Sequence, residues 1–94
     1  MNLRDDIKAG IIALAKQHGV KKVVLFGSRA RGDNWERSDI DLAVHGGDIV
    51  RFTLDVDDCI PTLLMFDVVN LDGAVQTELL EAIRQDGVVL YETT

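Results

Sequence analysis

The sequence predicts an α/β (α+β) fold in which a small β-sheet is flanked by helices. Segments whose apolar residues recur every three or four positions alternate with short runs rich in β-branched residues. Strands that are separated by helices form a sheet on which those helices pack. The chain has 94 residues, of which 47% are hydrophobic, so it can bury a modest core and is too apolar for a disordered chain. We therefore expect a single domain over residues 1–94.

The first half of the chain predicts a helix, a strand, a polar loop and a second strand. The helix is expected over about residues 3–18, where apolar residues recur at helical spacing before a glycine. The apolar run at 23–26 is expected to be a buried strand, because it ends abruptly at a Gly-Ser pair. The polar segment 27–38 predicts a loop, in which a short helix could open at Ser28. Apolar and other residues alternate over 40–44, which predicts a second strand.

The second half of the chain predicts two helices and two strands. Helical spacing returns over 49–59, with Asp48 as a cap and Pro61 as the stop. A third strand is expected over 63–71. A last helix is expected from Val75 to the glycine at position 87, and a short final strand follows over 88–91.

Composition and charge exclude several classes of protein. Sixteen acidic residues outnumber ten basic ones, so the net charge of -6 argues against a protein that coats nucleic acid. A single cysteine, Cys59, excludes an internal disulfide framework and a multi-cysteine zinc site, and we expect it to be buried as a small hydrophobe. No apolar run approaches the roughly 20 residues of a membrane helix, and the N-terminus lacks a signal-peptide pattern. We expect a cytoplasmic protein without a membrane or a direct nucleic-acid partner.

Three carboxylates occupy positions that suggest a metal site. Asp39 and Asp41 are two residues apart on a predicted strand and therefore face the same side, where they repel each other. A divalent cation that prefers oxygen ligands would relieve this repulsion, although an acidic pair on a solvated strand edge is the simpler interpretation. Asp67 lies inside an otherwise apolar strand and needs a partner. If the two strands pair, all three carboxylates can converge; otherwise Asp67 bonds to a backbone N–H or an arginine.

The Gly27-Ser28 pair directly follows a predicted buried strand. Glycine permits a sharp turn and a close approach to a ligand, and a helix that opens there would offer free N–H groups to an anion. Two arginines, Arg29 and Arg31, follow closely in a chain that is otherwise acidic. An ordinary strand-to-helix turn would explain the Gly-Ser pair on its own. Together, an anion cradle and a carboxylate cluster are what phosphoryl or nucleotidyl transfer requires.

The chain resembles the minimal nucleotidyltransferase (MNT) branch of the polymerase-beta-type nucleotidyltransferase superfamily. The resemblance rests on Gly27-Ser28-Arg29-Ala30-Arg31-Gly32, on Ser38-Asp39-Ile40-Asp41-Leu42 and on Phe66-Asp67-Val68-Val69. It covers essentially the whole chain. It implies a small mixed β-sheet flanked by helices, in the form of a polymerase-beta-like catalytic core.

The resemblance also implies roles for individual residues. The metal ligands would be Asp39, Asp41 and Asp67, holding two Mg²⁺ ions, and Asp67 would also help to activate the attacking hydroxyl. The residues that bind the nucleoside triphosphate, ATP, would be Gly27, Ser28, Arg31 and Ser38. Arg31 could instead pair with a partner protein.

A partner protein is expected as well. Larger members of the superfamily carry a second, helical domain that closes over the nucleotide, whereas this chain ends after the last predicted strand. Similar members pair with a HEPN-domain protein encoded nearby, a ribonuclease-type toxin, and are thought to transfer AMP from ATP to one of its tyrosines. The first hypothesis is therefore a Mg²⁺-dependent protein adenylyltransferase that acts as an antitoxin in a hetero-oligomer. A second is an antitoxin that masks the toxin by binding alone. A third, a nucleotidyltransferase for a small molecule such as an antibiotic, is disfavoured by the lack of a second substrate-binding domain.

Overall fold

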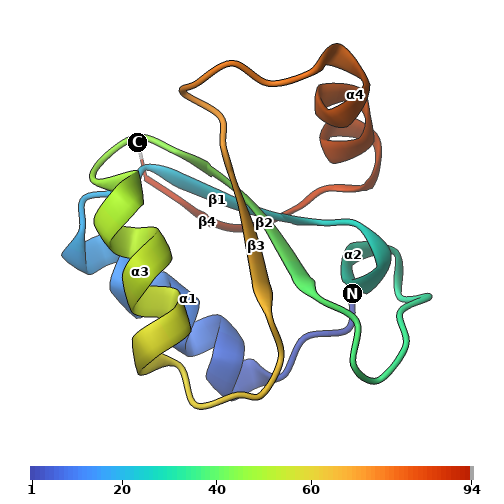
Figure 1. The fold of residues 1–94 in the computed structure, drawn as a ribbon, viewed down its shortest axis with the longest axis horizontal. Coiled ribbons are helices and arrows are strands. Elements are labelled where there is room, and N and C mark those ends of the chain that lie inside the picture. The colour runs from blue at the N-terminus through green and yellow to red at the C-terminus, as the bar shows by residue number, and fades with distance from the viewer. Residues whose placement is uncertain (94) are drawn as a thin grey trace.

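Residues 1–93, which the structure, a computed structural model, describes, form a four-stranded mixed sheet with helices on both faces (Figure 1). The elements in chain order are α1 Asp5–Gln17, β1 Lys22–Phe26, α2 Ser28–Arg31, β2 Ile40–His45, α3 Ile49–Cys59, β3 Phe66–Asn70, α4 Thr77–Asp86 and β4 Val88–Glu92. The strand order is β3-β2-β1-β4. Strand β1 is antiparallel to β2 and β4, and β2 is parallel to β3. The predicted fold class and element order are confirmed; Thr94, the last residue of the expected domain, lies outside the described residues.

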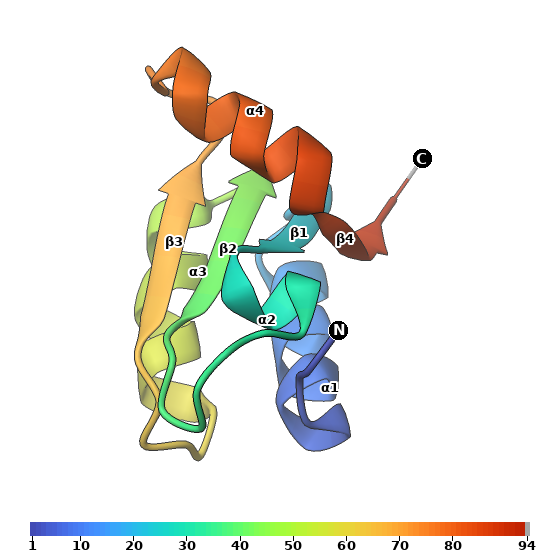
Figure 2. The ribbon, with the colours of Figure 1, turned by 90° about the vertical axis from the view of Figure 1, so that its right-hand side faces the viewer.

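Alternate residues of the central strands face two separate hydrophobic clusters. On one face, Val23 and Leu25 of β1 join a large core with buried residues of α1 and α3. On the other face, Val24 and Phe26 join a smaller cluster with Ile83 of α4. Figure 2 shows this division, with α1 and α3 behind the sheet and α4 across one end of its front. The front of the sheet is therefore only partly covered by α4.

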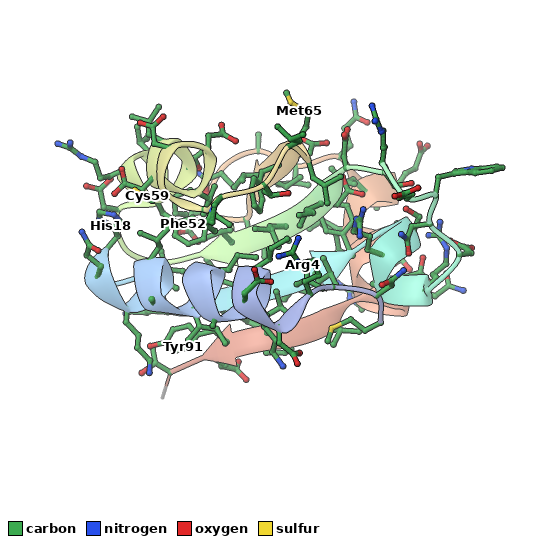
Figure 3. The ribbon with its side chains drawn as sticks, turned by 90° about the horizontal axis from the view of Figure 1, so that it is seen from below. Arg4, His18, Phe52, Cys59, Met65 and Tyr91 are labelled. Carbon is green, nitrogen blue, oxygen red and sulfur yellow. The ribbon has the colours of Figure 1, made fainter. Side chains whose placement is uncertain are left out.

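The helices α1 and α3 pack against each other on the fully covered face. Phe52 of α3 is fully buried and lies between the two helices (Figure 3). At the far end of α1, Nε2 of His18 lies 2.6 Å from Oδ2 of Asp55 in α3. The start of α3 is capped as predicted, because the side chain of Asp48 accepts a hydrogen bond from the backbone N–H of Arg51. Since α3 connects the parallel strands β2 and β3, its docking fixes their relative position.

Two predicted boundaries and one burial expectation differ from the structure. The third strand is expected over 63–71, whereas β3 begins only at Phe66 and ends at Asn70. Residues 60–65 form a turn instead, in which the N–H of Leu64 donates to the Thr62 hydroxyl. The last helix begins two residues later than Val75. Cys59 is exposed rather than buried, because the chain leaves α3 at this point and the next residue, Ile60, takes the buried position. Within residues 1–93 no helix is both long and apolar enough to cross a membrane.

Candidate functional site

The turn after β1 has a backbone conformation that requires glycine. Gly27 has φ +74° and ψ −156°, a region that is essentially restricted to this residue. The short helix α2 begins at the next residue, Ser28, where the sequence allowed a helix to open, and Gly32 directly after it has the left-handed conformation. Among residues 1–93, no side chain caps the start of α2. Ser28 is half-buried, so this turn presents backbone N–H groups and one hydroxyl beside the end of β1.

The acidic residues lie at the adjacent end of the sheet. Asp39 directly precedes β2, and Asp41 is the second residue of that strand. In the parallel pairing of β2 with β3, Asp41 lies opposite Asp67. Both aspartates follow residues that pack in the large core, Ile40 and Phe66, so their side chains point to the other face of the sheet, where α4 lies. The pairing on which convergence of the three carboxylates depended is therefore present.

The Gly27 turn touches this acidic group directly. A β-carbon placed on Gly27 would overlap Oδ2 of Asp41 and lie 3.3 Å from its Cγ. The antiparallel register explains the contact, because Asp41 pairs with Phe26, the residue before the turn. The Gly27 turn and the carboxylates therefore form one candidate site rather than two.

The charges in this site act on each other. Burial raises the pKa of the Asp41 carboxyl, and the negative charges of Asp67 and Asp39 raise it further. The nearby guanidinium of Arg31 acts in the opposite direction. Among residues 1–93, no hydrogen bond or ion pair engages any of the three carboxylates. The carboxylate of Asp41 is thus repelled by its two acidic neighbours, and the charge of Arg31 partly offsets that repulsion.

The donor atoms of this corner suit Mg²⁺, although they do not form a closed cage. In the part of the chain that the structure describes, no group of three or more His, Cys, Asp or Glu side chains is arranged to hold a metal ion by itself. Mg²⁺ is usually bound through one or two carboxylates, with waters and substrate phosphates as its other ligands. A pair such as Asp39 and Asp41 meets that requirement, and Asp67 lies next to it in the sheet.

The two arginines after the turn have different surroundings. Arg31 is exposed and bonded to two carboxylates: its Nε lies 3.1 Å from Asp33 Oδ2, and its Nη1 lies 3.0 Å from Asp86 Oδ2 in α4. These bonds raise the pKa of Arg31 further above its usual high value. Arg29 is buried, and its guanidinium donates to three backbone carbonyls. The sequence indicated the two arginines as one basic group but not the separate surroundings of Arg29, whose backbone partners leave no signal in the sequence.

Ser38 has a structural partner within its own loop. Its hydroxyl accepts a hydrogen bond from the backbone N–H of Trp35, and its own N–H donates to the Trp35 carbonyl. The two bonds close a tight turn that leaves the Trp35 side chain 84% exposed. Ser38 therefore shapes the loop that leads into Asp39.

A groove of about 1170 Å³ lies elsewhere on the molecule, between the start of α1, the loop at 34–37, the end of α3 and the segment 60–65. Its lining includes Arg29 but not Gly27, Asp41 or Asp67. The candidate site is thus an open corner of the sheet and does not coincide with this groove.

Comparison with known proteins identifies the family and the fold of this chain. The family described as "Polymerase beta, Nucleotidyltransferase" matches residues 10–94. The chain belongs to this family. It is therefore an enzyme of the nucleotidyltransferase type, and the turn and acidic residues described above lie within the matched segment.

Individual relatives agree with this assignment. The nucleotidyltransferase is 43% identical over 82 residues to the "Putative protein adenylyltransferase MJ0604" of Methanocaldococcus jannaschii. The aligned residues are 85% of this chain and 79% of that protein. A crystal structure of a toxin–antitoxin with AMP-PNP matches with a TM-score of 0.73 and 26% identity, over 93% of this chain and 74% of that one. The structure of a "putative minimal nucleotidyltransferase" matches with a TM-score of 0.66 and 28% identity, over 86% of each chain.

Proposed function

We propose that this nucleotidyltransferase is a Mg²⁺-dependent protein adenylyltransferase that transfers AMP from ATP to a tyrosine of a HEPN toxin and so acts as an antitoxin. The observation that carries the proposal is the register of β2 with β3, which sets Asp41 beside Asp67 next to the Gly27 turn. We call the turn at Gly27 and Ser28 the phosphate turn, because it would hold phosphate. A phosphate turn in contact with carboxylates is the arrangement that nucleotidyl transfer needs. The similarity to the "Putative protein adenylyltransferase MJ0604" of M. jannaschii supports a protein acceptor.

The turn after β1 would hold the triphosphate of ATP. The N–H groups at the start of α2 and the Ser28 hydroxyl can donate to phosphate oxygens, and Gly27 lets the phosphates approach the backbone closely. Arg31 would contribute once a phosphate competes with Asp33 and Asp86 for its guanidinium. Ser38, in the loop beside Asp39, would also contact the bound nucleotide.

The carboxylates would hold the metal and guide the acceptor. Asp39 and Asp41 would be the shared ligands of two Mg²⁺ ions, and Asp67 would complete one of the two sites. Bound Mg²⁺ neutralises charge that develops on the phosphate oxygens and lowers the pKa of an oxygen bound to it. Asp67 would orient the tyrosine hydroxyl and help to take up its proton. The new bond joins the tyrosine oxygen to the α-phosphorus of ATP, the bond from that phosphorus to the β-phosphate oxygen breaks, and pyrophosphate leaves.

A toxin partner would complete the system. The similar crystal structure of a toxin–antitoxin with AMP-PNP supports both a toxin partner and an adenine nucleotide as ligand. The acceptor tyrosine would reach the carboxylates from the open front of the sheet, which α4 covers only at one end. Modification of the toxin would leave it unable to cleave RNA.

The decisive experiment is to mix the protein with the HEPN protein encoded next to it, ATP and Mg²⁺, and to weigh the HEPN protein by intact-mass spectrometry. We expect a gain of one or more AMP units on a tyrosine, and no gain with EDTA or with Asp41→Ala. The matched control is Asp58→Ala, which removes an exposed carboxylate from α3. An unchanged mass with a verified toxin partner would contradict the proposal.

The same experiment separates the alternatives. If the toxin keeps its mass and Asp41→Ala still neutralises it in cells, the protein acts by binding alone. If instead AMP appears on an aminoglycoside supplied as acceptor, the substrate is a small molecule.

A further inference from the structure

We propose that Arg29 is a positioning residue of the nucleotidyl-transfer site, which sets the backbone that carries Asp39. The inference rests on the proposed function for its kinetic consequence, whereas its structural part can be tested without any activity. Arg29 is 6% exposed and lies in α2, directly after Ser28 of the phosphate turn. Its guanidinium reaches across to the loop that precedes β2.

Within the part of the chain that the structure describes, the guanidinium of Arg29 is held by backbone carbonyls alone. Its Nε lies 3.0 Å from the Ser38 oxygen, its Nη2 3.0 Å from the Glu36 oxygen and its Nη1 3.3 Å from the Asn2 oxygen. Among residues 1–93 no carboxylate lies within ion-pair distance of it. A buried charge is costly unless its donors are satisfied, so these bonds make the fold depend on this loop conformation.

Arginine fits this task better than lysine. Its planar guanidinium offers five donors in a rigid fork, which can bond to several carbonyls in fixed directions at once. Two of the three carbonyls, those of Glu36 and Ser38, belong to the turn that the Ser38 hydroxyl closes with Trp35. Lysine would keep the charge but lose the fork.

The bond to Ser38 fixes the peptide that enters Asp39. On the other side of Asp39, the N–H of Ile40 donates to the Met65 carbonyl at 2.9 Å. The peptides before and after Asp39 are therefore both held, by Arg29 and by the segment that leads into β3. The carboxylate of Asp39 itself has no hydrogen-bond partner among residues 1–93, so its position depends on this backbone.

One residue thus links the two halves of the site. The backbone of Arg29 belongs to the helix that begins at the phosphate turn, and its side chain holds the loop that presents a metal ligand. Groups that orient a metal ligand from behind typically contribute tenfold to a hundredfold to metal affinity or activity. Loss of the fork should therefore weaken the use of Mg²⁺ more than the binding of ATP.

The test compares Arg29→Lys and Arg29→Gln with the control Arg37→Gln, which removes an exposed arginine from the same loop. The first readout is amide hydrogen exchange of residues 32–40, together with the fluorescence anisotropy of Trp35, the single tryptophan of the chain. We expect faster exchange over 32–40 and lower anisotropy in both Arg29 variants, while the control matches the unmodified protein. Far-UV circular dichroism verifies that each variant is folded.

The second readout is the rate of AMP transfer as a function of Mg²⁺ concentration. We expect the Mg²⁺ concentration for half-maximal rate to rise about tenfold in Arg29→Lys, with a smaller change in the KM for ATP and partial rescue by excess Mg²⁺. A folded Arg29→Lys variant with unchanged exchange over 32–40 and an unchanged Mg²⁺ dependence would overturn the inference. If the unmodified protein transfers no AMP, the proposed function fails, and the exchange readout alone then decides whether Arg29 holds the loop. If Arg29→Gln does not fold, Arg29→Lys, which keeps the charge, gives the answer.

Discussion

The α-carbon of Gly27 packs against the carboxylate of Asp41, with no room for a β-carbon between them. One residue belongs to the turn after β1 and the other to β2, so the contact aligns this turn with the acidic residues. The positive φ of Gly27 is part of the same arrangement, because it turns the chain away from the strand at this point. Position 27 therefore requires glycine for two separate reasons: the carboxylate of Asp41 leaves no room for a β-carbon, and the backbone has a positive φ.

Replacement of Gly27 by alanine should damage activity more than stability. The added methyl group would displace Asp41 or open the turn, and a displacement of about 1 Å at a reacting centre can cost about a hundredfold in rate. We expect kcat/KM for AMP transfer to fall about a hundredfold in Gly27→Ala. Gly19→Ala is the matched control, because Gly19 also has a positive φ, but none of the described atoms of residues 1–93 lies within 4 Å of a β-carbon there. Equal activity in the two variants would show that the contact with Asp41 is irrelevant.

Neutralising Asp41 should stabilise the metal-free protein while abolishing transfer. The pKa of Asp41 is raised in the folded state, so its contribution to stability is present below about pH 4 and is lost as pH rises through the folded pKa. At pH 7 the ionised group is therefore unfavourable to folding, and Asp41→Asn removes that cost. We expect a higher Tm for Asp41→Asn than for the unmodified protein in EDTA, measured by differential scanning fluorimetry. Mg²⁺ should raise the Tm of the unmodified protein only, and a lower Tm for Asp41→Asn in EDTA would contradict the prediction.

The contribution of Asp72, in the loop after β3, to the free energy of unfolding should depend on pH in the opposite direction. A hydrogen bond from His45 lowers the pKa of Asp72, and the backbone N–H of Gly46 lowers it further. A lowered folded pKa gives stability that is present above the unfolded value of about 4 and is lost as pH falls through the folded pKa. Asp72→Asn should therefore be less stable than the unmodified protein at pH 7 and equally stable near about pH 2, as measured by urea unfolding. A difference that persists unchanged at acid pH would show that the carboxylate charge is not the cause.

The ion pair between Arg31 and Asp86 should compete with nucleotide binding. Both groups are accessible to solvent, and Asp86 occupies a donor that a phosphate would need. We expect Asp86→Asn to lower the KM for ATP about two- to fivefold and Arg31→Gln to raise it by a similar factor, the scale of one charge pair near the surface. Glu81→Gln, an exposed acid on the same helix, is the control. The role of Arg31 in binding ATP would be refuted if Arg31→Gln left the KM unchanged.

Local patterns in the sequence predicted the elements well, because the information is local. The alternation around Asp41 placed its side chain opposite the buried Ile40 and Leu42, and the structure confirms this. The pairing of Asp41 with Asp67 could only be stated as a condition, since strand register depends on how α3 docks on the far face. Strands β2 and β3 and helix α3 between them could each be predicted from their own residues, whereas the placement of these elements relative to one another could not.

The missed features depend on contacts that leave no trace in residue type. The partners of Arg29 are carbonyls at positions 2, 36 and 38, and every residue carries a carbonyl. The exposure of Cys59 depends on the residue at which α3 ends, which sequence patterns locate only to within a few positions. The first feature required the positions of atoms from other segments of the chain, and the second required the exact end of one helix.

The exposed thiol of Cys59 has a practical consequence. It is the single cysteine of the sequence, and it lies at the end of α3, on the face of the sheet opposite the side chains of Asp41 and Asp67 (Figure 3). A maleimide tether would attach to one position only and hold every molecule in the same orientation on a sensor surface. The corner with the carboxylates would then face the solution, where arrival of nucleotide and departure of a modified partner can be timed one after the other.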